Sequence, residues 1–158
     1  MIQRIQTVYL SFVVILMILT YFFDHAVFSL EGVDIYTFSV DKLTTLSDGT
    51  SIQAGNWMAQ IGLMSLVSII AIMAIASFKN RKRQLQLGKI NYLLLIAFIL
   101  SDYFSIKNMP MLMPEGEELA TLYTFGFYFP IAALTFQFLA NRGIKKDEEL
   151  VRSVERLR

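Results

Sequence analysis

Residues 57–89 have the sequence WMAQIGLMSLVSIIAIMAIASFKNRKRQLQLGK, a long uncharged segment followed directly by a basic one. Its first part, Met58 to Phe78, contains no charged residue. A helix of that length crosses a hydrocarbon core of about 30 Å. A basic segment without a single acid follows at once, and it consists of Lys79, Arg81, Lys82, Arg83 and Lys89. Because basic loops stay on the cytoplasmic side, these residues predict the orientation of the helices before and after them.

Apolar runs elsewhere in the chain extend this pattern to four predicted membrane spans, at residues 5–23, 57–78, 90–106 and 119–140. Hydrophobic residues make up 55% of the 158 residues and charged residues 17%, a composition typical of membrane proteins. The predicted fold is a single domain, residues 1–158, of the all-α membrane class. It is a four-transmembrane-helix bundle with its N and C termini in the cytoplasm.

The segment between the first two spans is polar and mostly acidic, so it is expected outside the cytoplasm. It contains two β-prone runs, Ala26–Leu30 and Val33–Val40, on either side of a Glu31-Gly32 turn signal. These features predict a small extracytoplasmic β-hairpin between helices 1 and 2. Two short strands are not stable alone, so the hairpin is expected to rest on the helix ends or on a partner.

Small residues recur at every third position of the span at 57–78. A row of this kind lets two helices approach closely, which is how helices associate in lipid. Packing within the chain's own bundle is the favoured interpretation, and a contact seam for another protein is the alternative. The row consists of Ala59, Gly62, Ser65, Ser68, Ala71, Ala74 and Ser77.

Asp102 is the only acidic residue within a predicted span. An Asp at the centre of the bilayer costs about 2.5–3.5 kcal/mol on insertion scales, so an acid at that depth usually has a function. A proton or ion relay is one candidate. Asp102 lies near the outer end of its helix, however, close to Lys107. A structural or interfacial role is therefore favoured over a relay.

No catalytic, cofactor or metal site is predicted. The chain has no Cys, and its single histidine, His25, forms no recognisable catalytic or zinc motif. Met109, Met111 and Met113 alternate in an outer loop, and thioethers at such spacing suit Cu(I). Contact with apolar surfaces is the more ordinary use of methionine. Nucleic-acid binding is not expected, because the positive-inside rule already accounts for the basic segment.

Residues 141–158 are predicted to form a cytoplasmic amphipathic tail, separated from the fourth span by Gly143. Its apolar residues Leu150, Val154 and Leu157 are spaced i, i+4 and i+7 and so share one face of a helix. So short a helix is marginal by itself in water. Its acidic residues disfavour anionic lipid, so docking of this face on protein is predicted.

The two ends of the chain, MIQRIQTVYL at residues 1–10 and NRGIKKDEELVRSVERLR at residues 141–158, resemble a family of small four-helix membrane proteins from Bacteroidota. The family is known as a domain of unknown function, number 4293. The resemblance implies an inner-membrane location in a Gram-negative cell. It implies no activity and no catalytic residues.

These observations lead to one expected function and one alternative. The expected function is that of a non-catalytic accessory subunit, which contacts membrane lipids and other integral subunits of a larger inner-membrane complex. A homo-oligomer, in which copies of this chain contact one another, is also possible under this interpretation. The alternative is a small carrier or membrane enzyme that uses a pocket between Asp102 and a kink at Pro130.

Overall fold

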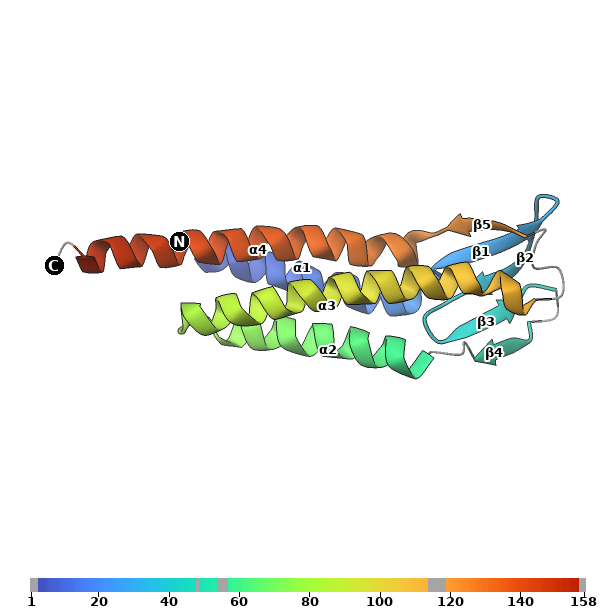
Figure 1. Cartoon of the computed structure of the whole chain (residues 1–158), viewed down its shortest axis with the longest axis horizontal. Coiled ribbons are helices and arrows are strands. Elements are labelled where there is room, and N and C mark those ends of the chain that lie inside the picture. The colour runs from blue at the N-terminus through green and yellow to red at the C-terminus, as the bar shows by residue number, and fades with distance from the viewer. Residues whose placement is uncertain (1–2, 48, 54–56, 114–118, 157–158) are drawn as a thin grey trace.

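A computed structural model describes residues 3–47, 49–53, 57–113 and 119–156. Over these residues the helices lie side by side in an elongated bundle, with a β-sheet at one end (Figure 1). The elements in chain order are α1 (Gln3–Phe22), β1 (Ala26–Leu30), β2 (Val33–Phe38), β3 (Lys42–Thr45), β4 (Ser51–Gln53), α2 (Trp57–Ala76), α3 (Arg81–Asn108), the 3-10 turn η1 (Pro110–Leu112), β5 (Ala120–Tyr123) and α4 (Phe125–Arg156).

The sheet shows that the predicted all-α fold class is wrong. Within the described residues it has five antiparallel strands in the order β4-β3-β2-β1-β5, rather than one small hairpin. Three strands were missed, for two different reasons. β3 and β4 are too short to give a clear alternating pattern. β5 was assigned to the start of the fourth span, because its apolar residues run into the helix that follows.

The predicted turn between β1 and β2 is confirmed. Glu31 and Gly32 both have positive φ, at 50° and 84°, as a two-residue hairpin of the primed type requires. β1 pairs with β2 on one side and with β5 on the other, Ala26 lying opposite Tyr123. The sheet therefore joins the end of α1 to the start of α4.

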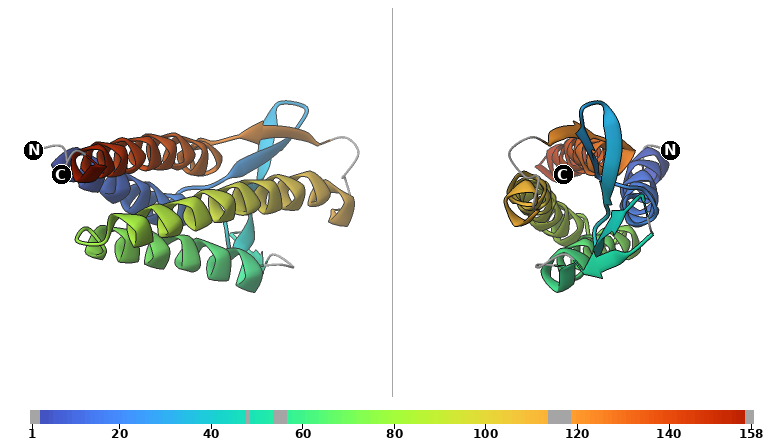
Figure 2. Two further views of the ribbon diagram at one scale, coloured as in Figure 1. Left: turned by 60° about the vertical axis from the view of Figure 1, so that its left-hand side comes forward. Right: turned by 90° about the vertical axis from the view of Figure 1, so that its right-hand side faces the viewer.

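The four helices of the described chain form a closed ring in which α1 contacts α2 and α4, and α3 contacts α2 and α4. Figure 2 shows this ring in its end-on view. The centre of the ring is an apolar core of Val13, Met17, Val40, Val67, Ala71, Leu95, Phe98 and Ala133. A second core, which includes Ala26, Phe28, Phe38, Ile106 and Met109, holds the sheet against the end of α3.

The outer surface of the bundle is apolar and its interior contains polar side chains. Large exposed hydrophobic residues occur on every helix, including Phe12, Ile69, Leu93, Phe104, Tyr128 and Phe138. Gln6, Gln60, Asn91 and Gln137 are buried instead. Among the described residues, Ile5–Phe22, Trp57–Ala76 and Arg81–Asn108 are helices long and apolar enough to cross a membrane, and α4 is not one of them. These features indicate a membrane protein.

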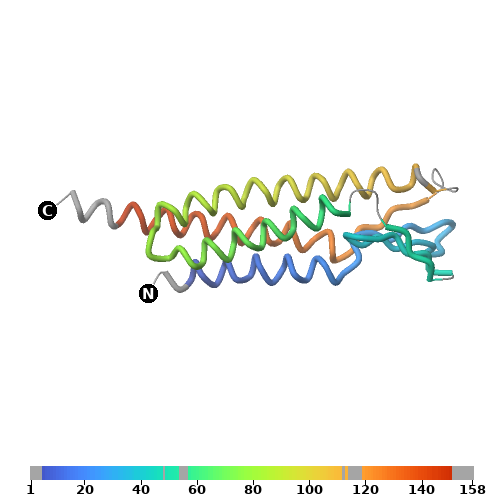
Figure 3. Tube along the Cα trace, turned by 90° about the horizontal axis from the view of Figure 1, so that it is seen from below, coloured from blue at the N-terminus to red at the C-terminus, as the bar shows by residue number. Residues whose placement is uncertain are grey.

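Two helices are longer than the predicted spans. α3 begins at Arg81 rather than at residue 90, because the side chain of Asn80 caps it by accepting a hydrogen bond from the Arg83 N–H at 3.1 Å. α4 begins at Phe125, after β5, and continues through Gly143 to Arg156. The start of α1 and the end of α4 lie at the same end of the bundle, opposite the sheet (Figure 3).

Gly143 is a close-packing position rather than a break between helix and tail. A Cβ atom at Gly143 would lie 3.1 Å from Cγ of Gln6 on α1. The next turn of α4 also contacts α1, because the Gln6 side chain donates a hydrogen bond to the buried carboxylate of Asp147. The first part of the predicted tail is therefore docked on the chain's own first helix.

Candidate functional site

His25 and Asp102 form a buried pair where the helix bundle meets the sheet. Nδ1 of His25 lies 2.8 Å from Oδ1 and 2.9 Å from Oδ2 of Asp102. The exposed fractions of the two side chains are 0% and 1%. The residues are 77 positions apart in the chain, so neither was identified as the partner of the other from sequence. Lys107, which sequence had placed near Asp102, is exposed.

The second imidazole nitrogen decides how many protons the pair holds. Nε2 of His25 lies 3.0 Å from the carbonyl oxygen of Thr20, which can only accept a hydrogen bond. Nε2 therefore carries a proton. The contact between Nδ1 and the carboxylate then needs one more proton, carried by either partner. In both arrangements the pair has no net charge, which makes its burial tolerable.

Asp102 determines the protonation of the histidine. Burial by itself lowers the pKa of His25. The hydrogen bond that Nδ1–H donates to Asp102 and the negative charge of that carboxylate raise the pKa, as do the Thr20 carbonyl and Asp24. The result is a pKa of His25 raised above the ordinary value of 6.5.

Backbone contacts hold His25 between the sheet and α4. Its N–H donates to the Phe38 carbonyl at 2.7 Å, and its carbonyl accepts from the Thr124 N–H at 3.0 Å. The Gly126 N–H donates to the Asp24 carbonyl at 3.0 Å. The Asp24 side chain accepts a hydrogen bond from the Ser39 hydroxyl at 2.6 Å. The site thus joins α1, β1, α3 and the start of α4.

Gly126 allows α4 to approach the histidine. A Cβ atom at this position would lie 2.5 Å from the Asp24 carbonyl oxygen and from Cδ2 of His25, and 2.6 Å from the Phe23 carbonyl oxygen. Contacts that short do not occur between real atoms, so any other residue would push α4 away from α1. Glycine was not identified from sequence as part of this site, because only the tertiary contact requires it.

Other polar side chains bridge the helices inside the ring. Asn91 donates to Gln137 at 2.9 Å, and Gln60 donates to Ser105 at 2.8 Å. At the end opposite the sheet, Gln6 donates to the buried carboxylate of Asp147 at 2.6 Å. In a medium without water such contacts stabilise helix association by about 0.6–2 kcal/mol each.

The predicted small-residue row divides into two halves. Ala71 and Ala74 are buried within the bundle, and Ser68 and Ser77 are half-buried. Ala59, Gly62 and Ser65, toward the sheet, are exposed. A Cβ atom added at Gly62 would have no neighbour within 4 Å. The row therefore serves internal packing at one end and leaves an open face at the other.

Among the described residues, the three methionines do not share one environment. Met109 is buried beneath the sheet, Met113 is half-buried, and Met111 is 84% exposed. Among the described residues no three His, Cys, Asp or Glu side chains are grouped to hold a metal ion. Leu150 is exposed, Val154 lies in the last turns of α4, and Leu157 lies outside the described residues.

Comparison with known proteins identifies a family and no activity. The family model described as Domain of unknown function (DUF4293) matches residues 2–157. None of the curated proteins matches the chain.

Proposed function

The chain belongs to this family of unknown function, and we propose that it is a non-catalytic accessory subunit of a larger protein complex in the inner membrane of a Gram-negative bacterium. In this proposal all four helices cross the membrane. Basic residues gather at the end of the bundle opposite the sheet, so that end is cytoplasmic and the sheet is extracytoplasmic. The outer half of α2 contacts the partner.

The arrangement of α4 supports a fourth membrane span. Two residues that lower its hydropathy, Gln137 and Asn141, are turned toward α3, where the Asn141 amide donates to the Gly88 carbonyl at 3.0 Å. The opposite face exposes Phe125 and Tyr128. A helix with its polar atoms satisfied inside the bundle and aromatic side chains outside is compatible with lipid on that side.

The observation that carries the proposal is the open half of the small-residue row, Ala59, Gly62 and Ser65. Such a face lets a helix of another protein approach closely, and no helix among the described residues fills it. The edge strand β4 lies just beyond the start of α2 (Figure 1). Ile52 in β4 is 68% exposed, and an unpaired apolar edge is a further contact for a partner.

The His25–Asp102 pair supports a structural rather than a catalytic function. Both carboxylate oxygens contact His25 Nδ1, and Nε2 contacts the Thr20 carbonyl, so these atoms are already engaged within the fold. The pair connects the sheet to α3. In this proposal it thereby holds β4 and the start of α2 in a fixed position relative to each other.

Leucine substitutions at two positions of the row test the proposed contact. Ser65→Leu adds a branched side chain on the open face, so we expect at least a tenfold loss of the partner that co-purifies after gentle detergent extraction, with an unchanged melting temperature. Ala71→Leu overpacks the core instead and should destabilise the bundle by about 1–3 kcal/mol. Quantitative mass spectrometry measures how much partner is recovered. If Ser65→Leu leaves that amount unchanged, this face contacts lipid only.

Cysteine labelling tests the orientation, and the absence of native Cys removes background labelling. Asp34 in β2 and Arg83 in α3 are both exposed. We expect Asp34→Cys to react with an impermeant maleimide added to intact spheroplasts, and Arg83→Cys to react only after the membrane is permeabilised. Labelling of Arg83→Cys in sealed spheroplasts would reverse the orientation.

A further inference from the structure

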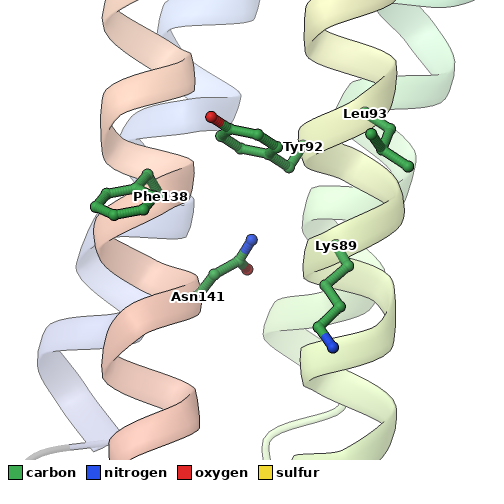
Figure 4. Close-up of a pocket in the computed structure, with 5 residues that line it drawn as sticks. All are labelled: Lys89, Tyr92, Leu93, Phe138 and Asn141. Atoms are coloured by element: carbon green, nitrogen blue, oxygen red, sulfur yellow. The ribbon is translucent and has the colours of Figure 1, made fainter.

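A groove between α3 and α4 lies near the basic end of the bundle, away from both the His25–Asp102 pair and the open face of α2. The groove is open to the outside and has a volume of about 260 Å³. Figure 4 shows Tyr92 lying between the two helices and Lys89 one turn closer to the basic end. The groove is lined by Lys89, Tyr92, Leu93, Phe138 and Asn141.

The amides at the floor of the groove are already engaged. The Asn141 amide donates to the Gly88 carbonyl at 3.0 Å, and its side-chain oxygen accepts from Gln137 at 3.1 Å. Gln137 also donates to the Gly88 carbonyl at 3.3 Å. Gly88 has no room for a side chain because the Asn141 side chain fills that space. The floor thus closes the groove and leaves a mainly apolar wall for a ligand.

The walls favour a hydrocarbon chain. Leu93 is 66% exposed and Phe138 is 53% exposed, so the groove opens onto the apolar outer surface of the bundle rather than into its interior. Its volume is below the about 300–1,000 Å³ of pockets for drug-sized molecules. One acyl chain lying along the two helices fits these walls better than a compact polar metabolite does.

The end of the groove favours an anionic headgroup. Lys89 is exposed, and within the described residues its ammonium has no acidic partner. Lys82 and Arg83 precede it on α3 and are also exposed. Lys89 stands where the polar start of α3 gives way to its apolar run, which is the level of the headgroups if α3 crosses the membrane. Basic pockets between helices at this level bind anionic phospholipids.

From this geometry we propose that the groove is a binding site for an anionic phospholipid on the cytoplasmic leaflet. Lys89 contacts the headgroup phosphate, and one acyl chain lies along Tyr92, Leu93 and Phe138. The inference rests on the membrane insertion described under the proposed function, and it does not depend on the partner that α2 contacts.

Lipid retention by matched lysine variants tests the site. Detergent-purified, delipidated protein is titrated with phosphatidylglycerol, and bound lipid is counted by native mass spectrometry. Lys89→Gln should lower retention about fivefold, which corresponds to the about 1 kcal/mol of a basic residue near an anionic surface. Lys82→Gln is the control, because it removes the same charge from an exposed position that does not line the groove.

Two further titrations separate the possible sources of binding. Phosphatidylcholine, which has the same acyl chains and no net charge, should be retained less than phosphatidylglycerol. Glycerol phosphate, which has no acyl chain, should not displace the bound lipid. Equal effects of Lys82→Gln and Lys89→Gln, equal retention of the two lipids, or displacement by glycerol phosphate would each overturn the site.

Cysteine labelling in cells, applied to each lysine variant, tests membrane insertion independently of lipid binding. Correct labelling together with unselective lipid retention contradicts the lipid site alone. Incorrect labelling contradicts the insertion on which both proposals rest.

Discussion

Asp102→Ala should lower the free energy of unfolding by about 3–5 kcal/mol, the usual loss when one partner of a buried charged pair is removed. His25 would remain buried with Nδ1 facing an apolar methyl group, since its side chain is 0% exposed. Thermal unfolding in detergent, followed by circular dichroism, measures the loss. A melting temperature equal to that of the wild type would show that the pair does not hold the sheet to the bundle.

Asp102→Asn is the matched control. With Nε2 protonated against the Thr20 carbonyl, a neutral His25 can accept a hydrogen bond from the Asn side-chain amide at Nδ1. We expect Asp102→Asn to lose much less stability than Asp102→Ala. It should also retain any protein that co-purifies with the wild-type chain. Loss of all cellular function in a stable, assembled Asp102→Asn protein would favour a proton relay.

The same pair predicts how stability depends on pH. The pKa of His25 is raised by folding, so its stabilising contribution is complete below the ordinary value of 6.5 and is lost as pH rises through the raised value. Melting temperatures measured from pH 6 to pH 9 should fall with increasing pH in the wild type. In Asp102→Asn this dependence should disappear, because burial without the carboxylate keeps the imidazole neutral.

Gly126→Ala should have the second largest effect, a loss of about 1–3 kcal/mol from overpacking. Its methyl group would lie about 2.5 Å from the Asp24 carbonyl oxygen and 2.6 Å from that of Phe23, and both are backbone atoms that cannot rotate aside. The start of α4 must therefore move away from His25. Chemical denaturation in micelles measures the effect.

Gly62→Ala provides the comparison for Gly126→Ala. A Cβ atom at Gly62 has nothing within 4 Å, so this change should stabilise α2 by up to about 1 kcal/mol through helix propensity. Opposite signs for the two substitutions are expected. Similar effects from both would show that α4 does not pack closely against the end of α1.

Much of the helical part of the fold was predictable because its signal is local. The uncharged run from Met58 to Phe78 predicted α2 within two residues at its C-terminal end, and the Glu31-Gly32 turn was located correctly. The sheet was not predictable to the same extent. β5 becomes a strand only by pairing with β1, about ninety residues earlier in the chain, and no pattern within Ala120–Tyr123 contains that information.

Hydropathy and charge are properties of neighbouring residues, so the sequence was enough to locate the apolar helices, the basic segment and the one acid, Asp102, within a predicted span. The tertiary structure was needed to show that His25 is the partner of Asp102, that Gly126 must lack a side chain, and which half of the small-residue row is open. Each of these depends on segments far apart in the chain meeting at distances of a few ångströms. Hydrogen bonding and close packing act only at that range, so those features exist once the helices and the sheet have come together.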